Sequence, residues 1–592
     1  MLRAAALVAA VVIAYSPAFT AGFIWDDDDY ITDNRTLTEP GGLTEIWLSP
    51  GATPQYYPLV FTSFLVEQRL FGRTPAGHHA VNVLLHAGSA LLLWRLLTTV
   101  AVPGAWLAAA LFALHPVQVE SVAWIAERKN VLSGLFFLAG ALTFLQWAGL
   151  RAGDGDRSGS TRGAPGRLAT AAVLFAAALF SKTVTATLPV SLGAVLWWKR
   201  GRLSRRELLA LAAFAAAGAG MGMVTLRLER TVVGAVGPAW DLTFVERLLV
   251  AGRAFWFYLG KLAWPSELAF IYPRWDPQAA SWGWGLWPAA AAAFVLGLWA
   301  LRRRIGRGPL VACLHFAGSL GPAFGFVNVF PMQFSFVADH FQYLATIGPL
   351  TLAASLIWRL VAPAGTPGRR PWLLAAAFAL PVAMGLLTHQ QSRFYQDSAT
   401  LWGHTVTLNP GSWMVHSNLS RALAARDDRA GAESELREAL RLEPSVPSAW
   451  FRLGELAAAG GRLGEAVELF QRALDLVPMY ADAHDGLGDS LTRLGRDADA
   501  EEHLLAAGWL KPRDPKPRLH LGYLYLSQGR VSEATKALTD AVELEPGSPE
   551  ARLGLGRSLA AQGLRREALE QFRHALSLRP GWAEAEAALA GG

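Results

Sequence analysis

The sequence predicts an all-α protein, with a polytopic helical membrane bundle over residues 1–390 and a helical-repeat solenoid over residues 391–592. Long apolar runs separated by clusters of basic residues fill the first part. In the second part, which is charged and polar, prolines recur at a fixed spacing. The 592 residues are 52% hydrophobic and 17% charged, a composition that is not typical of a wholly soluble protein.

Eleven apolar runs in the first part are candidates to cross about 30 Å of hydrocarbon. They lie near residues 4–23, 79–99, 104–118, 131–150, 168–181, 184–198, 207–226, 284–301, 309–328, 341–361 and 371–388. The first run follows Arg3 and resembles a signal peptide, but the many runs behind it favour an uncleaved helix. We therefore expect about eleven spans.

Basic clusters predict the orientation of these spans, because lysine and arginine concentrate in cytoplasmic loops. The clusters are Arg3; Arg151, Arg157, Arg162 and Arg167; Lys199, Arg200, Arg202, Arg205 and Arg206; Arg302, Arg303, Arg304 and Arg307; and Arg369 and Arg370. An even number of crossings must separate any two of them. The run 246–264, with three cations of its own, is therefore assigned to the outer interface rather than to a span. The repeats then lie outside.

Composition narrows the functional classes further. The basic residues lie between apolar segments, which favours a membrane protein and gives no nucleic-acid partner. Cys313 is the single cysteine, so neither an intramolecular disulfide nor a cysteine-based zinc site is available. Arginine and alanine are abundant, which indicates a GC-rich genome. We expect a multi-pass protein of a bacterial inner membrane, with its repeats in the periplasm.

The second part has the tetratricopeptide period. Prolines occur every 34 residues, at Pro410, Pro444, Pro478, Pro512, Pro546 and Pro580. Alanines of the expected second helices align with them, and five repeats follow: 413–446, 447–480, 481–514, 515–548 and 549–582. Such solenoids present concave surfaces to peptides or partner proteins, so the repeats are expected to bind an acceptor. We interpret the repeat histidines as surface or packing residues.

Polar residues that could carry chemistry lie in the predicted outer loops. They are the run Asp26 to Asp29; His115, Glu120, Arg128 and Lys129; Lys182; and Asp339, His340 and Tyr343. Singly, each has an ordinary explanation, since aspartates cap helices, histidines pack in cores and cations anchor lipid headgroups. Together they place carboxylates and cations on one side of the membrane, as a transferase with a lipid-phosphate donor requires.

A polar stripe is predicted on the second span. His79, Asn82 and His86 share one helical face, which points to neighbouring helices. A metal bound by the two histidines is one interpretation, but a hydrogen-bonded contact between helices is favoured.

Several strings resemble the family of transmembrane, tetratricopeptide-containing O-mannosyltransferases, which are GT-C glycosyltransferases. They are Phe23-Ile24-Trp25-Asp26-Asp27, Tyr57-Pro58-Leu59, His79-Ala80-Val81-Asn82, His115-Pro116, Glu120-Ser121-Val122-Ala123-Trp124, Arg128-Lys129 and Ser181-Lys182. The resemblance covers nearly the whole chain. It implies a polyprenyl- or dolichyl-phosphate-linked donor of mannose or a similar hexose, and a Ser/Thr hydroxyl acceptor outside the cytoplasm.

The resemblance also implies roles for individual residues. Asp26 or Asp27 would be the general base, with Asp27 slightly favoured, while Asp28 and Asp29 hydrate the loop. Glu120, beside His115, would orient acceptor or sugar, and Arg128, Lys129 and Lys182 would hold the donor phosphate. His79, Asn82, Asp339, His340 and Tyr343 complete the expected substrate-binding set. The chain departs from the family at three positions: Tyr57 and His340 stand where arginine is usual, and Thr183 stands where glutamate is usual.

The expected reaction inverts the anomeric carbon, with the aspartate accepting the hydroxyl proton and cations stabilising the leaving phosphate. This logic requires no cofactor and leaves a divalent metal open. Three alternatives remain: a non-catalytic membrane scaffold, a transporter of lipid-linked sugars, and a transferase acting on a lipid or polysaccharide.

Overall fold

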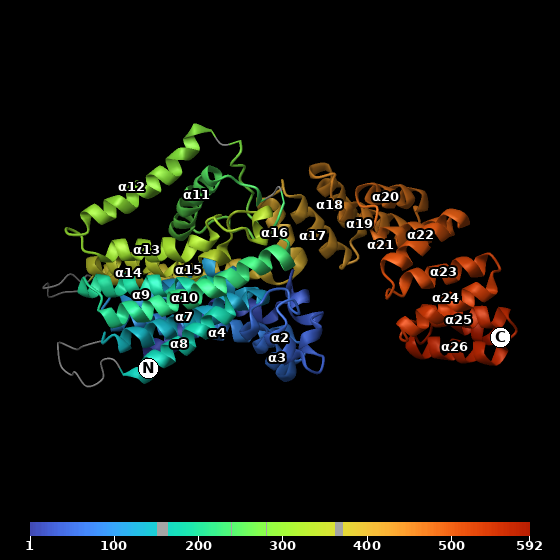
Figure 1. The fold of residues 1–592 in the computed structure, drawn as a ribbon, viewed down its shortest axis with the longest axis horizontal. Coiled ribbons are helices and arrows are strands. Elements are labelled where there is room, and N and C mark those ends of the chain that lie inside the picture. Colours follow the sequence, from blue (N-terminus) through green and yellow to red (C-terminus); the bar gives the residue numbers. More distant parts are fainter. Residues whose placement is uncertain (151–163, 238–239, 280, 362–370, 592) are drawn as a thin grey trace. The chain divides into compact units, whose positions relative to one another are not determined.

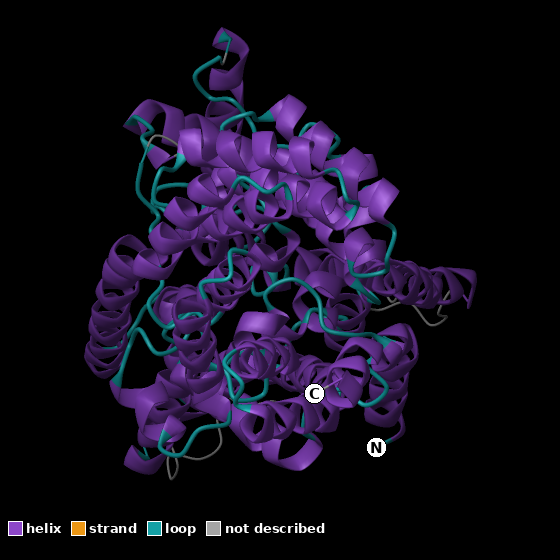
Figure 2. Ribbon diagram, turned by 90° about the vertical axis from the view of Figure 1, so that its right-hand side faces the viewer, coloured by secondary structure: helices purple, strands orange, loops and turns teal. Residues whose placement is uncertain are grey.

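The computed structural model describes residues 1–150, 164–237, 240–279, 281–361 and 371–591, and these divide into two compact units. The first is Met1–Pro410 and the second is Gly411–Gly592 (Figure 1). Every regular element in the described ranges is a helix (Figure 2). Arg151, Arg157, Arg162, Arg369 and Arg370 lie outside the described residues.

The first unit contains sixteen α-helices within its described residues. They are α1 (Leu2–Ala14), α2 (Gly42–Leu48), α3 (Pro58–Phe71), α4 (Pro75–Thr99), α5 (Ala105–Leu114), α6 (Val119–Ala123), α7 (Arg128–Trp147), α8 (Pro165–Ser181), α9 (Leu188–Arg200), α10 (Arg205–Leu228), α11 (Phe244–Ala263), α12 (Leu286–Leu301), α13 (Gly308–Leu320), α14 (Ile347–Val361), α15 (Pro371–Ser392) and α16 (Ser398–Leu408). The sequence placed the change of domain at residue 390, whereas the division between units falls after Pro410, so α16 belongs to the first unit.

Five helical segments of the described chain are long and apolar enough to cross a membrane. They are Pro75–Thr99, Ile125–Trp147, Arg205–Val233, Trp282–Leu301 and Trp372–Tyr395. The bent pair of Ala105–Leu114 and Pro116–Ala123 is a sixth if it counts as one span, and Leu2–Ala14, Pro165–Ser181 and Ile347–Val361 are shorter apolar helices. The expected eleven spans are therefore not confirmed. The runs 184–198 and 309–328 form α9 and α13, of 13 residues each, which reach about 20 Å at 1.5 Å per residue.

The run 104–118, expected as one of the spans, is broken by a bend in the structure. Helix α5 ends at Leu114, and the chain bends by 55° into residues 116–123. Pro116 explains the break, because proline lacks an N–H donor and disfavours helical geometry in the residue before it. His115 is extended, with φ −76° and ψ 128°. We call residues 115–127 the bend segment; all of them are buried.

The broken helix leaves carbonyls that the surrounding helices satisfy. The Ala113 carbonyl lies 3.0 Å from His86 Nε2 of α4, and the Leu114 carbonyl accepts a hydrogen bond of 2.7 Å from the Thr388 hydroxyl of α15. Backbone groups that leave a helix inside a membrane must find such partners. The bend is thus held between α4 and α15.

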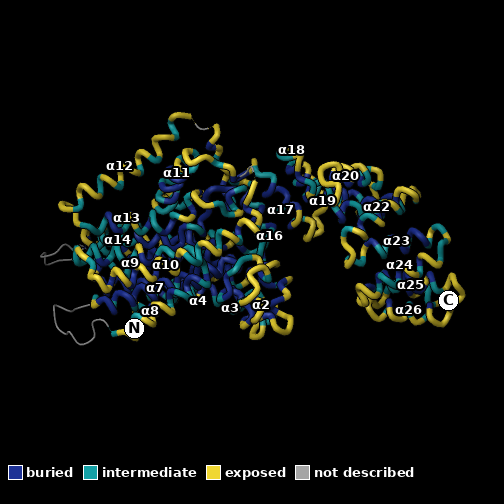
Figure 3. Tube along the Cα trace, in the orientation of Figure 1, coloured by how far each residue is buried: buried dark blue, intermediate teal, exposed yellow. Residues whose placement is uncertain are grey.

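Helices α11 and α12 differ in polarity and in their side-chain contacts. In α11, Arg247 donates to the Asn328 side chain at 2.9 Å, and Arg253 lies over the rings of Trp275 and Trp284 at 4.5 and 4.6 Å. In α12, by contrast, no residue is buried, so a wholly apolar helix faces its surroundings (Figure 3). A helix of this kind requires a lipid environment. The interfacial position of α11 stays a prediction.

The second unit is built from helix pairs. Its helices are α17 (Trp413–Ala424), α18 (Arg429–Leu442), α19 (Pro447–Ala459), α20 (Leu463–Leu476), α21 (Ala481–Arg493), α22 (Asp497–Leu510), α23 (Lys516–Ser527), α24 (Val531–Leu544), α25 (Pro549–Ala561), α26 (Arg565–Leu578) and α27 (Ala583–Gly591). The first ten form five pairs that match the five predicted repeats.

Small residues allow the two helices of each pair to approach closely. The alanines aligned in the sequence, Ala432, Ala466, Ala500, Ala534 and Ala568, are all buried. A Cβ added at Gly454 or Gly488 would meet the side chain of Phe470 or Leu504 in the paired helix. Glycine at this position is therefore a packing requirement, and the repeat assignment is confirmed.

Candidate functional site

The buried centre of the first unit is a carboxylate held by two lysines. Glu127, at the end of the bend segment, has Oε1 2.9 Å from Lys129 Nζ and Oε2 3.2 Å from Lys182 Nζ. Asn130 donates to Glu127 Oε2 at 2.6 Å and accepts from Lys182 Nζ at 2.8 Å. We call these four residues the Glu127 cluster. Burying three charges is costly unless they are paired, and here both lysines pair with Glu127.

Lys129 connects the cluster to the segment that follows α1 and contains the aspartate run. Its Nζ lies 3.4 Å from Tyr30 Oη and 3.3 Å from Gln55 Oε1, and the Tyr30 hydroxyl itself donates to Gln55 at 2.9 Å. Trp124 also faces the ammonium, with its ring centre 5.8 Å away. The loop that contains the aspartate run is therefore attached directly to the lysines.

Within the aspartate run, Asp27 is a structural link. Its Oδ2 accepts from the Ile24 N–H at 2.9 Å and its Oδ1 from the Ala126 N–H at 2.7 Å. The residue is fully buried, and burial raises the pKa of its carboxyl. Because both oxygens are occupied by backbone donors, Asp27 ties the first loop to the bend segment.

Asp26 lies in a different environment. It is partly exposed, and no hydrogen bond to its carboxylate is found among the described residues. Burial raises the pKa of Asp26 to about 6, while the positive charge of Lys129 opposes that rise. The charges of Glu127 and His340 act on the same carboxyl, so Asp26 lies in the electrostatic neighbourhood of the Glu127 cluster. Asp28 and Asp29 are exposed, as the sequence indicated.

Arg128 does not lie where a phosphate-binding residue is expected. Its guanidinium is fully buried, forms an ion pair with Glu67, and is bonded to the Asn82 side chain. The same group donates to Ser63 at 3.2 Å and to the His78 carbonyl at 2.9 Å. These contacts join α3, α4 and α7, so Arg128 holds helices together rather than presenting a cation to a ligand.

Glu120 and His340 form a second buried pair. The Glu120 carboxylate lies 2.8 Å from His340 Nδ1 and accepts from the His340 backbone N–H at 2.9 Å. Neighbouring Asp339 accepts from Tyr272 at 3.0 Å and from Gln342 at 3.2 Å. Burial, and then the charge of Glu120, raises the pKa of Asp339 to about 8. The His340 imidazole also lies 3.9 Å from Glu127, which joins this pair to the cluster.

The predicted polar stripe on α4 makes helix contacts. Asn82 donates to the carbonyls of Val122 and Trp124, each at 3.2 Å, and His86 Nδ1 lies 2.9 Å from Tyr343 Oη. His79 Nε2 lies 3.4 Å from the Gly22 carbonyl. These contacts agree with the interpretation of the stripe as a hydrogen-bonded contact between helices. Within the described ranges, no group of three or more His, Cys, Asp or Glu side chains is placed to hold a metal.

His115 also supports the fold around the site. Its Nε2 lies 3.0 Å from the Leu262 carbonyl near the end of α11, and its Nδ1 accepts from the Val117 N–H at 3.4 Å. It positions the bend segment and has no contact with the Glu127 cluster among the hydrogen bonds of the described chain.

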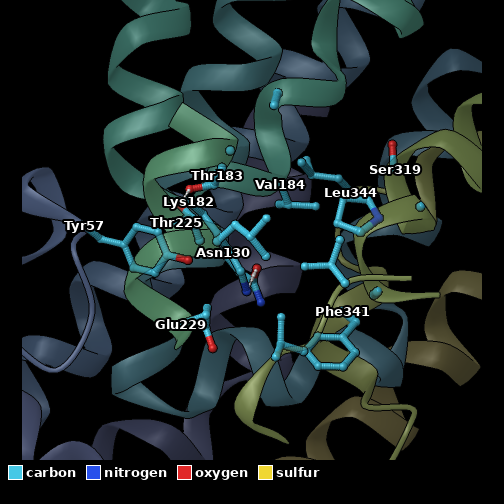
Figure 4. Close-up of a pocket in the computed structure, with 18 of the residues that line it drawn as sticks. Tyr57, Asn130, Lys182, Thr183, Val184, Thr225, Glu229, Ser319, Phe341 and Leu344 are labelled. Atoms are coloured by element: carbon cyan, nitrogen blue, oxygen red, sulfur yellow. Dashed lines mark hydrogen bonds between the residues drawn. The ribbon is translucent and has the colours of Figure 1, made fainter. Parts of the chain in front are cut away.

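A cavity of about 580 Å³ opens beside the Glu127 cluster. Figure 4 shows Tyr57, Asn130, Lys182 and Glu229 gathered on one side of it, with Phe341 and Leu344 opposite. Apolar residues of α10 and of residues 319–329 complete the wall, and Tyr343 lines it as well. This volume lies within the range of about 300–1,000 Å³ that ligand cavities occupy. Burial lowers the pKa of Lys182 to about 8, against the opposing charge of Glu127.

The structure therefore separates the expected site residues into two groups. Asp26, Lys129, Lys182, Glu120 and His340 gather around Glu127, whereas Asp27, Arg128, Asn82, His79 and His115 hold the scaffold. Three residues were not predicted as site residues: Glu127, Asn130 and Glu229. For Glu127, the available signal was its place in the charged run Glu127-Arg128-Lys129 within an apolar region. No pattern in the sequence pointed to Glu229.

Comparison with known proteins identifies the repeats first. Family models described as "Tetratricopeptide repeat" match residues 417–478, 465–515 and 525–591. Among solved structures, the tetratricopeptide protein YrrB is 24% identical over 32% of this chain and 98% of its own, with a TM-score of 0.27. The tetratricopeptide protein TTC0263 of Thermus thermophilus is 24% identical over 30% of this chain and 98% of its own, with a TM-score of 0.28.

Curated relatives share one name. Protein O-mannosyl-transferase TMTC4 of Homo sapiens is 30% identical over 159 residues, which cover 23% of this chain and 21% of the relative. TMTC2 of Mus musculus is 32% identical over 148 residues, covering 23% and 18%. Tmtc3 of Drosophila melanogaster is 30% identical over 181 residues, covering 25% and 19%.

About a quarter of the chain is similar in sequence to the TMTC protein O-mannosyl-transferases. The resemblance inferred from the sequence motifs is thus confirmed. The alignments span about a fifth of the length of these TMTC proteins. The activity, substrates and partners of this chain are therefore matters for the proposal that follows.

Proposed function

We propose that this chain transfers a hexose from a polyprenyl-phosphate donor to a Ser or Thr hydroxyl of a protein, on the outer side of a bacterial inner membrane. The hexose is mannose, in line with the names of the TMTC relatives. The observation that carries the proposal is the connection between the apolar cavity and the Glu127 cluster, whose charges act on the Asp26 carboxylate.

The cavity suits a lipid-linked phosphate. Its apolar wall matches a prenyl chain, and Lys182 on its polar side is placed to bind the phosphate. Lys129, the second cation, shares Glu127 with Lys182. In a site screened from water, fixed cations stabilise charge that develops on a leaving group far better than solvent does.

Asp26 is the general base in this proposal. Its pKa of about 6 keeps it ionised at neutral pH and makes it a stronger base than an ordinary aspartate. The acceptor hydroxyl gives its proton to Asp26 while its oxygen forms a bond to the anomeric carbon. The bond from that carbon to the phosphate oxygen breaks, the phosphate keeps the electron pair, and the configuration inverts.

Two departures from the family motifs meet inside the cavity. Tyr57 and Thr183 both line it, and the Thr183 hydroxyl lies within hydrogen-bonding reach of Tyr57. Thr183 also lies 2.6 Å from the Thr225 hydroxyl. Where the resemblance implies an arginine and a glutamate, this chain has two neutral hydroxyl groups. The third departure, His340, keeps a partner in Glu120.

The repeats serve as the acceptor-binding part of the proposed enzyme. Tetratricopeptide solenoids present extended surfaces to peptides. The repeats of this chain have the helix pairs that such a surface requires.

A transfer assay with the full chain tests the function. Purified protein in lipid nanodiscs is incubated with polyprenyl-phosphate mannose and a library of Ser/Thr peptides, and the products are read by mass spectrometry. Addition of one hexose residue, about 162 Da, to a hydroxyl is expected from the wild type and not from Asp26→Asn. Release of mannose to lipid or glycan without peptide modification would contradict the protein acceptor.

A second measurement places the function in cells. Envelope and secreted proteins are compared with and without the chain, and with Asp26→Asn in its place. Loss of hexose modification in both altered strains supports the proposal. A strain carrying Asp26→Asn that keeps every modification would instead favour a scaffold.

A further inference from the structure

The cavity contains one carboxylate that the fold does not satisfy. Glu229, in the turn Glu229–Val233 after α10, is 7% exposed and lines the cavity. Its Oε2 accepts one backbone hydrogen bond, from the Phe330 N–H at 3.3 Å. Among the described residues it forms no ion pair, and no partner is found for its Oε1.

The other buried carboxylates of the first unit are more completely bound. Asp27 has two backbone donors, Glu67 has Arg128 and His78, and Glu127 has Lys129 and Lys182. Glu120, Glu207 and Asp339 likewise have two donors each. A buried carboxylate with a single donor pays a desolvation penalty that a ligand can relieve. Glu229 is thus the exception, and it is the one that lines the cavity.

The surroundings of Glu229 indicate the chemistry of that ligand. Tyr57, Thr183 and Thr225 line the same side of the cavity, and each has a hydroxyl group. An ionised carboxylate only accepts hydrogen bonds, while hydroxyls both donate and accept. A group that presents several hydroxyls matches this set, and a second phosphate does not, because it would bring like charge against Glu229.

We propose that Glu229 accepts hydrogen bonds from hydroxyls of the donor sugar and so selects a hexose over a bare lipid phosphate. Lys182 binds the phosphate on the same side of the cavity, so the sugar attached to that phosphate lies within reach of Glu229. This assignment rests on the proposed function for the identity of the donor. It makes Glu229 a specificity-determining residue distinct from the base and from the cations.

The test is a binding measurement with matched donors. Wild type, Glu229→Gln and Asp241→Asn, all as the full chain in nanodiscs, are titrated with polyprenyl phosphate, with polyprenyl-phosphate mannose, and with its mono-deoxy analogues. Gln keeps an oxygen to accept from Phe330 and preserves the shape of the side chain. Asp241 is exposed, so Asp241→Asn removes the same charge outside the cavity and controls for net charge.

Glu229→Gln is expected to weaken the binding of the mannosylated donor about 10- to 100-fold, which is the range for hydrogen bonds to a charged group. The affinity for bare polyprenyl phosphate should change by less than about 3-fold. The analogue that lacks the contacted hydroxyl should bind the wild type more weakly than the parent donor does, by the same factor. The analogue and the parent donor should bind Glu229→Gln almost equally well. Such non-additivity reports direct contact between the two groups.

Equal weakening of bare and mannosylated lipid by Glu229→Gln, or additive losses with every deoxy analogue, would overturn the assignment. Transfer to peptide is measured in the same samples. A wild type that shows the expected binding pattern but transfers no sugar would reject the proposed function and leave the role of Glu229 intact.

Discussion

In residues 1–410 the ion pairs near α7 are buried, whereas in residues 411–592 the arginine and lysine pairs lie on the surface. Glu127, with 1% of its side chain exposed, meets Lys129 and Lys182, while Arg530 and Glu501 pair with 35% and 27% exposed. Exposed pairs contribute about 0–1 kcal/mol, and buried ones cost desolvation that stability alone does not repay. Buried charges therefore need a reason beyond stability, which is a helix contact for Arg128 and Glu67 and a candidate site for the Glu127 cluster.

The surface pairs follow the repeating structure of the second unit. Four of them join residues 29 positions apart: Glu433–Arg462, Asp482–Lys511, Glu501–Arg530 and Glu550–Arg579. Glu433–Arg462 and Glu501–Arg530 join the second helix of one repeat to the start of the second helix of the next, whereas Asp482–Lys511 and Glu550–Arg579 join the two helices of a single repeat. These contacts hold neighbouring helices of the solenoid together and require no ligand.

The largest expected effect concerns the two neighbouring aspartates. Asp26→Asn should lower sugar transfer by about 100-fold or more, because no carboxylate then accepts the hydroxyl proton. Its folding should be unharmed, since Asp26 has no hydrogen bond to lose within the described chain. Initial rates with polyprenyl-phosphate mannose and thermal unfolding measure the two properties.

Asp28→Asn is the matched control, because Asp28 is exposed and lies two residues from Asp26. It should retain near wild-type transfer. Asp27→Asn should instead lower thermal stability, since its two backbone donors lose the charged acceptor. Full activity of Asp26→Asn, together with an inactive but stable Asp27→Asn, would move the base to Asp27.

The next effect tests the buried scaffold. Arg128→Met should destabilise the first unit by about 3–5 kcal/mol, because it leaves the buried Glu67 carboxylate without its cation. Unfolding of the purified chain in nanodiscs, followed by heat or denaturant, measures this loss. Adding Glu67→Gln to the variant should recover part of it. Normal stability combined with weakened donor binding would show that Arg128 binds phosphate after all.

The pH dependence of transfer should have two limbs. Asp26 must be ionised to act as base, so activity is expected to fall as pH drops below about 6. Lys182 must be protonated to hold the phosphate, so activity should also fall as pH rises above about 8. Each limb changes the rate about tenfold per pH unit. Lys182→Arg should remove the alkaline limb, because arginine stays charged.

Ionisation of Asp26 should lower the stability of the fold as pH rises, although it raises the activity. Its pKa rises from 3.8 to about 6 on folding, so between these values the folded chain binds more protons than the unfolded chain. Its contribution therefore lowers stability as pH rises from about 4 to about 6. The melting temperature at pH 7 should be higher for Asp26→Asn than for wild type, and a lower one would contradict this environment.

The smallest effect is expected in the repeats. Arg530→Met removes the exposed contacts to Glu501 and Glu533 and should change stability only slightly, because water screens exposed ion pairs. Unfolding of the full chain followed by a repeat-specific probe measures it. A loss as large as that of Arg128→Met would erase the distinction between the two units.

Much of the organisation was predictable from residue order alone. The 34-residue proline spacing and the aligned alanines determined the repeats, because each repeat is a local unit that meets only its neighbours. Apolar length and composition determined that the first part belongs in a membrane, and the misplaced charges pointed to the region of the site. These are properties that a one-dimensional pattern contains.

Only the tertiary structure decided which polar residues are used by the fold and which remain for chemistry. Adjacent residues of the same charge diverge: Asp27 is bound by two backbone donors while Asp26 lies under the charge of Lys129, and Arg128 is bound to Glu67 while Lys129 joins the Glu127 cluster. Glu229 enters the cavity from a turn that no motif marks. The partner that neutralises a buried charge comes from a distant helix, and sequence spacing does not contain that distance.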